Sequence, residues 1–164
     1  MENSFPYYFS TALIISYLIF GIIGAITIKI LLTWANRTVR VLDLVRGAAS
    51  WILGPLIVLF INTTFLADEG FFPLFAFYGF LIGFVIAIAM RACLIKANLM
   101  LSWRYVLISG AIWGFGFMGL LYQQIVGTDF QIIFMFLIFI IAGIGGSTAL
   151  VIGLEKYRIA NLTR

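Results

Sequence analysis

The chain has 164 residues, of which 64% are hydrophobic and 10% are charged, whereas a soluble domain carries about 25% charged residues. Together with a mean hydropathy of +1.18, this composition indicates a protein whose solvent is lipid and excludes a sizeable soluble domain. The sequence contains no histidine, the commonest metal ligand and proton shuttle, and its single Cys93 excludes an internal disulfide.

A helix needs about 20 apolar residues to cross a bilayer, and five stretches of the chain approach this length. In chain order they cover approximately residues 9–30, 48–67, 71–91, 105–125 and 131–154. The first stretch is longer than the apolar region of a signal peptide and has no basic residue before it, so we interpret it as a retained span. The sequence therefore predicts an all-α, polytopic integral membrane protein with five transmembrane helices in a single domain over residues 1–164.

The connections between these stretches differ in charge. Basic residues occupy or flank the connections at 35–47 and 92–104 and the C-terminal tail, so that all ten fall on one side. Short turns at 68–70 and 126–130 hold three acids on the other side, Asp68, Glu69 and Asp129. Because Lys and Arg stay on the cytoplasmic side, we expect the N-terminus outside and the C-terminus in the cytoplasm, in the plasma (inner) membrane.

The sequence also repeats itself. Residues 25–36 read AITIKILLTWAN, and residues 87–98 read AIAMRACLIKAN, with five identities and a Lys29/Arg91 pair that keeps the charge. Farther along, Trp51 and Trp113 coincide at the same offset. We predict parallel helical-hairpin pseudo-repeats with a period of about 62 residues, at roughly 48–98 and 110–161 with a half repeat at 9–36. Shared apolar composition is the alternative explanation.

Several repeated residue types suit structural roles. Small residues four apart allow close helix packing, and they occur at Gly21/Ala25, Gly79/Gly83/Ala87, Gly110/Gly114 and Ala142/Gly146. Asparagine tolerates the left-handed backbone at a helix end, which suits Asn36, Asn98 and Asn161. Tryptophans at the inner membrane boundary would form an aromatic belt, with Trp34, Trp51 and Trp103 near it and Trp113 deeper.

Polar residues near the outer ends of the second and fourth spans form a candidate polar layer or solute path. Its members are Asn62, Thr63, Thr64, Gln123 and Gln124. Amides in lipid must find hydrogen-bond partners, so these side chains either line a path for a polar solute or bond between helices. In the inner half of the second span, Pro55 follows Gly54 and makes a candidate hinge, or else a fixed kink.

The first basic connection, RTVRVLDLVRG at 37–47, places Arg37, Arg40, Asp43 and Arg46 at every third position. This spacing predicts a short helix lying on the cytoplasmic leaflet, with possible pairs of Asp43 with Arg40 and Arg46. Arg37, Arg40 and Arg46 are therefore candidate contacts for lipid or a partner. Ordinary accumulation of positive charge on this side is the competing explanation.

The sequence does not indicate an enzyme. It has no buried acid for coupled transport, no metal-ligand cluster and no activated nucleophile, so we expect no catalytic residues, no metal and no cofactor. Its +4 charge follows from topology, and nucleic acid is not expected as a partner. We expect a small subunit or assembly partner of a larger membrane complex, in contact with lipid and other membrane helices. The alternative is an oligomeric channel or facilitator for a neutral or anionic small solute.

Overall fold

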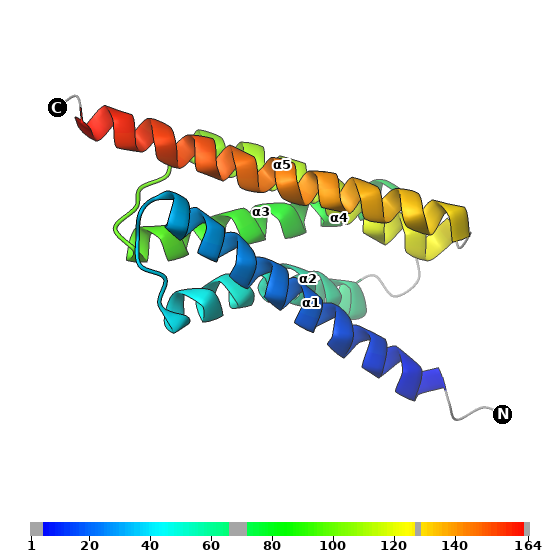
Figure 1. Ribbon diagram of the computed structural model, residues 1–164. Coiled ribbons are helices and arrows are strands. Elements are labelled where there is room, and N and C mark those ends of the chain that lie inside the picture. Colours follow the sequence, from blue (N-terminus) through cyan, green and yellow to red (C-terminus); the bar gives the residue numbers. More distant parts are fainter. Residues whose placement is uncertain (1–4, 66–71, 127–128, 163–164) are drawn as a thin grey trace.

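The computed structural model describes residues 5–65, 72–126 and 129–162, and within these ranges every regular element is an α-helix (Figure 1). The five helices are α1 (Phe5–Trp34), α2 (Val41–Phe65), α3 (Phe72–Lys96), α4 (Trp103–Val126) and α5 (Asp129–Leu162). The prediction of an all-α chain with five helices is confirmed, because each predicted span coincides with one of them. The predicted acidic turn at 68–70 lies outside the described residues.

The predicted helix boundaries are wrong at the basic connections. Residues 41–47 are the first two turns of α2 rather than a separate helix lying on a membrane surface, and residues 92–96 are the last turn of α3. The actual connections are short, at 35–40 and 97–102. The helix continues through Gly47 because this residue is held against α1, where Ile28 and the backbone oxygen of Gly24 leave no space for a side chain.

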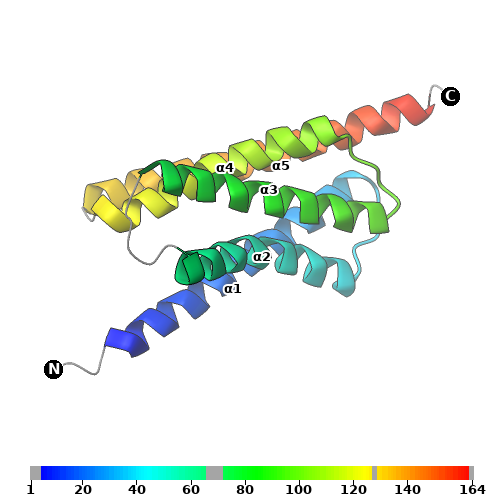
Figure 2. The same ribbon diagram turned by 180° about the vertical axis from the view of Figure 1, so that it is seen from behind.

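Helices that are neighbours in sequence are neighbours in space. α1 packs on α2, α2 on α3, α3 on α4 and α4 on α5, whereas α1 and α5 meet over a small area. Figures 1 and 2 show the connections 35–40 and 97–102 and the C-terminal end of α5 at one end of the bundle, which we call the connection end. The N-terminal end of α1 lies at the opposite end. This alternation agrees with the predicted up-and-down topology.

Two segments among the described residues are long and apolar enough to cross a membrane, namely Tyr17–Trp34 in α1 and Ala76–Lys96 in α3. The apolar character of α1 extends around the whole helix, since Ile28 and Leu31 are buried while Ile26 and Ile30 are exposed. A helix that is apolar on every side belongs either in a large core or in lipid. Length and composition thus support a membrane location for these two helices.

The two connections at this end begin with the same turn. Asn36 and Asn98 have positive φ angles of 53° and 59°, which confirms the left-handed conformation predicted for them. In each turn the residue after Asn donates its N–H to a carbonyl five residues earlier, Arg37 to Leu32 at 2.8 Å and Leu99 to Leu94 at 2.9 Å. These are Schellman caps 62 residues apart. The same prediction for Asn161 is wrong, because α5 continues to Leu162.

Replacing Asn98 with alanine is expected to lower the free energy of unfolding by about 1 kcal/mol, because a Cβ without a polar group disfavours positive φ. Asn98→Gly should stay within about 0.5 kcal/mol of the native protein, since glycine adopts this conformation readily. Denaturant unfolding of the purified protein in detergent, followed by circular dichroism, measures both changes. Equal losses for the two variants would contradict the backbone argument.

Glycines bring the helices of each pair into close contact. Gly83 of α3 lies against the backbone of Gly110 and Gly114 in α4, and a Cβ on Gly83 would collide with both. At the same offset of 62 residues, Gly21 of α1 lies against Ala48 and Ile52 of α2. The small residues of the four predicted stripes thus lie mainly inside the bundle, where they pack against helices of the same chain.

The centre of the bundle is filled by two tryptophans that occupy equivalent positions in the repeat. Trp51 of α2 and Trp113 of α4 are each 1% exposed, and their rings meet edge to face with centroids 5.1 Å apart. The Trp113 Nε1–H donates to the carbonyl of Gly143 in α5 at 3.4 Å. Trp51 was predicted as part of an aromatic belt, which is wrong, because its ring is buried and fills the space that Gly24 leaves open. Trp34 and Trp103 are exposed, and their position at a membrane boundary stays a prediction.

Candidate functional site

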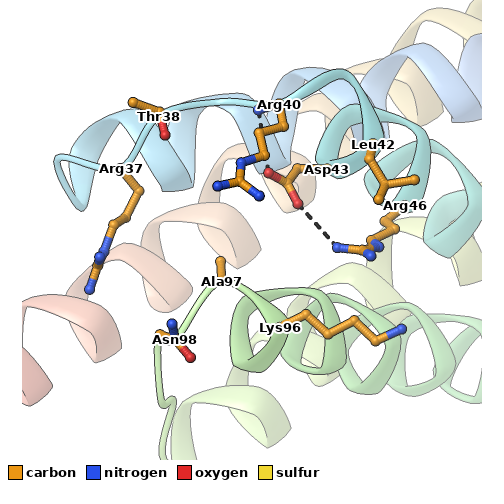
Figure 3. A pocket seen from close by; sticks show the side chains of 9 residues that line it. All are labelled: Arg37, Thr38, Arg40, Leu42, Asp43, Arg46, Lys96, Ala97 and Asn98. Atoms are coloured by element: carbon orange, nitrogen blue, oxygen red, sulfur yellow. Dashed lines mark hydrogen bonds and ion pairs between the residues drawn. The ribbon is translucent and has the colours of Figure 1, made fainter.

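A cavity of about 440 Å³ opens at the connection end, between the α1–α2 connection, the first turns of α2 and the end of α3 (Figure 3). We call it the basic cavity, because cationic side chains dominate its lining. The lining residues are Arg37, Thr38, Arg40, Leu42, Asp43, Arg46, Lys96, Ala97 and Asn98. The structure therefore brings together all three arginines that the sequence analysis singled out as contacts for lipid or a partner.

Local backbone geometry places these side chains. The Schellman cap at Asn36 ends α1 and turns the chain so that Arg37 and Arg40 lie over the cavity. The equivalent cap at Asn98 ends α3 immediately after Lys96, on the opposite wall (Figure 3). Because both caps are hydrogen-bonded within the backbone, the two walls are positioned by the fold rather than by flexible side chains.

Asp43 organises one wall of the cavity. Its carboxylate is largely buried, with the residue 8% exposed. Oδ2 accepts the backbone N–H of Arg40 at 3.3 Å, and Oδ1 lies 3.3 Å from Nη1 of Arg46. An acid at the third helical position that reaches back to the residue before the helix is half of a capping box. The predicted Asp43–Arg46 pair is confirmed, whereas Arg40 contacts Asp43 through its backbone instead of its guanidinium.

The electrostatics of the cavity favour an anion. The cavity is lined by four cationic side chains and a single carboxylate, and that carboxylate is already engaged by Arg46 and by the start of α2. Within the part of the chain that the structure describes, no acidic side chain pairs with Arg37, with the Arg40 guanidinium or with Lys96. These three side chains are also exposed, so a ligand from solution or from a membrane surface can reach them.

Lys96 and Asn98 were not predicted as part of this site. They lie about sixty positions after Arg37 and Arg40, at the end of a different helix. The available signal was the repeat itself, which makes Asn98 the equivalent of Asn36 and sets the two turns at the same end. A sequence repeat does not show that the two turns lie side by side in space. The turns are close to each other because α2 packs against α3.

The other predicted sites lie elsewhere. Gly54 sits against α3, where a Cβ would lie 3.0 Å from Cγ2 of Ile82, so the glycine is explained by close packing. Pro55 lies inside α2, half-buried, where it removes one helix hydrogen bond. The residues of the predicted polar layer lie near the C-terminal ends of α2 and α4, and their side chains are outside the described part of the structure. Its members are Asn62, Thr63, Thr64, Gln123 and Gln124.

Among the described side chains, no group of three His, Cys, Asp or Glu residues lies close enough to hold a metal ion. Comparison with known proteins found no matching family model, no similar curated protein and no similar solved structure. The chemistry of the basic cavity is therefore the strongest guide to a binding site in this chain.

Proposed function

We propose that the chain is a five-span integral membrane protein of the plasma (inner) membrane, with its N-terminus outside and the connection end in the cytoplasm. The apolar lengths of Tyr17–Trp34 and Ala76–Lys96 support membrane insertion. The accumulation of basic residues at the connection end supports the orientation, because Lys and Arg resist translocation. The even alternation of helix direction is what a chain of five consecutive spans requires (Figure 2).

Within the membrane, we propose that the protein is non-catalytic and acts as a small subunit or assembly partner of a larger complex. The supporting observation is the contact between Trp51 and Trp113, which fills the middle of the described bundle with aromatic rings. Phe117 adds a third ring, 6.1 Å from Trp51 between centroids. Rings packed in this way occupy the middle of the bundle, which supports a function carried out at its surfaces.

The outer surface of α1 is the surface best suited to a partner helix. α1 stands at the end of the row, packs mainly on α2, and leaves one long apolar face uncovered by its own chain. The exposed side chains of this face are Ile14, Ile15, Leu18, Ile19, Ile22, Ile26 and Ile30. In lipid such a face has no hydrophobic drive toward another helix, so association would depend on complementary packing.

The competing function is an oligomeric channel or facilitator for a neutral or anionic small solute. The basic cavity favours an anion over a neutral solute, because it would concentrate negative charge at one end of the bundle. Since the centre of one copy is filled, the path of such a channel would lie between copies.

Purification in a mild detergent, followed by mass measurement of the intact assembly, distinguishes the two functions. The subunit proposal expects different chains in a fixed ratio, and liposomes that stay impermeable when the protein alone is inserted. Ile22→Trp on the exposed face of α1 should release the partner, whereas Leu53→Trp on an exposed position of α2 should not. A homo-oligomer that makes liposomes permeable, with less flux in Asn62→Leu or Gln124→Leu, would overturn the subunit proposal.

A further inference from the structure

We propose that the basic cavity binds a phosphate group, carried either by a lipid headgroup or by a small soluble phosphate. The cavity combines arginines and a lysine from two different helical hairpins around one open space. Arg37, Arg40 and Arg46 come from the α1–α2 connection and α2, while Lys96 comes from the end of α3 (Figure 3). A bound phosphate would therefore bridge the two hairpins.

The side-chain chemistry favours phosphate over other anions. A guanidinium presents its N–H donors in a planar fork that matches two phosphate oxygens, and lysine adds a compact point charge. Asp43 offsets only one of the four positive charges, because it is paired with Nη1 of Arg46 and accepts the backbone N–H of Arg40. The guanidinium of Arg40 is thus left to face the cavity next to Arg37.

The size of the cavity fits a small anionic group. Its volume of about 440 Å³ falls within the range of roughly 300–1,000 Å³ that is typical of small-ligand sites. The hydroxyl of Thr38 and the amide of Asn98 lie on its wall and add uncharged hydrogen-bonding groups. Both walls are fixed by the caps at Asn36 and Asn98, so little ordering of the backbone is needed on binding.

Ordinary positive charge at a membrane surface is the explanation to be excluded. Arg104 provides the matched control, because it lies in the first turn of α4, is exposed, and does not line the cavity. A diffuse electrostatic effect responds to the loss of any cation at this end, whereas a built site responds to the loss of cavity residues alone.

The test uses the full chain purified in an uncharged maltoside detergent at about 0.15 M salt. Two probes are titrated, namely inorganic phosphate and mixed micelles of phosphatidic acid in phosphatidylcholine, with pure phosphatidylcholine as the blank. We expect saturable binding of at least one probe. Arg40→Gln and Lys96→Gln should each weaken it about tenfold or more, and Arg104→Gln should weaken it by less than about twofold.

The pattern of binding identifies the source of the phosphate. Binding of the phosphatidic acid micelles alone assigns a lipid headgroup, and binding of inorganic phosphate as well assigns a soluble ligand. A cooperative thermal unfolding transition shows that each variant is folded. If Arg40→Gln is unstable, Lys96→Gln still tests the site, because the Lys96 side chain is exposed and its replacement should disturb the fold little. Absence of saturable binding of both probes, or equal weakening by Arg104→Gln and Lys96→Gln, would overturn the proposal.

Discussion

Gly83→Val is expected to lower the free energy of unfolding by about 3 kcal/mol, the upper part of the usual range for an overpacked core. The Cβ would collide with the carbonyl oxygen of Gly110 and the backbone nitrogen of Gly114. Both obstacles are main-chain atoms of α4, so no side-chain rotation relieves the clash. Helices α3 and α4 would have to move apart. This movement would disturb the packing that places Trp113 at the centre of the bundle.

Thermal or denaturant unfolding in detergent micelles measures this loss, and Gly143→Val is the matched control. Gly143 lies in α5, and a Cβ built there meets no atom within 4 Å. The same substitution at this position should change the free energy of unfolding by less than about 1 kcal/mol, mainly through helix propensity. Similar losses at Gly83 and Gly143 would show that the close approach of α3 and α4 is not what stabilises the fold.

Trp113→Ala is the second substitution with a large expected effect, a loss of about 3–5 kcal/mol in the free energy of unfolding. The indole is 1% exposed, its ring meets Trp51 at 5.1 Å, and Gly146 of α5 lies directly against it. Truncation removes these contacts and the hydrogen bond from Nε1 to the carbonyl of Gly143. The cavity left between α2, α4 and α5 would close only partly, because surrounding structure relaxes incompletely after such a truncation.

The control for this variant is Trp34→Ala, which removes the same side chain from a position that is 55% exposed. It should cost less than about 1 kcal/mol, as surface substitutions usually do. Trp113→Phe should fall between the two, because the phenyl ring retains part of the contact with Trp51. Unfolding followed by tryptophan fluorescence reports all three variants, and a small loss for Trp113→Ala would contradict a central role for the tryptophan pair.

Both effects are expected to be large for the same physical reason. In the membrane setting proposed above, apolar side chains would gain little from leaving the solvent, so close packing between helices would supply most of the association energy. The glycines permit backbone approach, and the two tryptophans fill the volume that remains between the helices. Arg91 adds a polar contact at the connection end, where its Nε–H donates to the carbonyl of Leu101 at 3.1 Å and its guanidinium lies 4.2 Å from the centre of the Trp103 ring.

Several features could be predicted from the sequence because they depend on neighbouring residues. Helix number and approximate bounds follow from apolar runs of sufficient length, and the turns at Asn36 and Asn98 follow from the tolerance of asparagine for positive φ. The Asp43–Arg46 pair also follows from spacing along one helix. Arg37, Arg40 and Arg46 could be grouped from the sequence because they lie close together along the chain.

The tertiary structure alone decided which side of each helix faces the protein. Large apolar residues occupy exposed as well as buried sides of the helices, so no hydrophobic stripe in the sequence marks the buried face. Trp51 was therefore expected in an aromatic belt at the membrane boundary, although its ring lies in the core. Lys96 joins the arginines only because α3 packs on α2, a contact between distant residues that local chemistry does not encode.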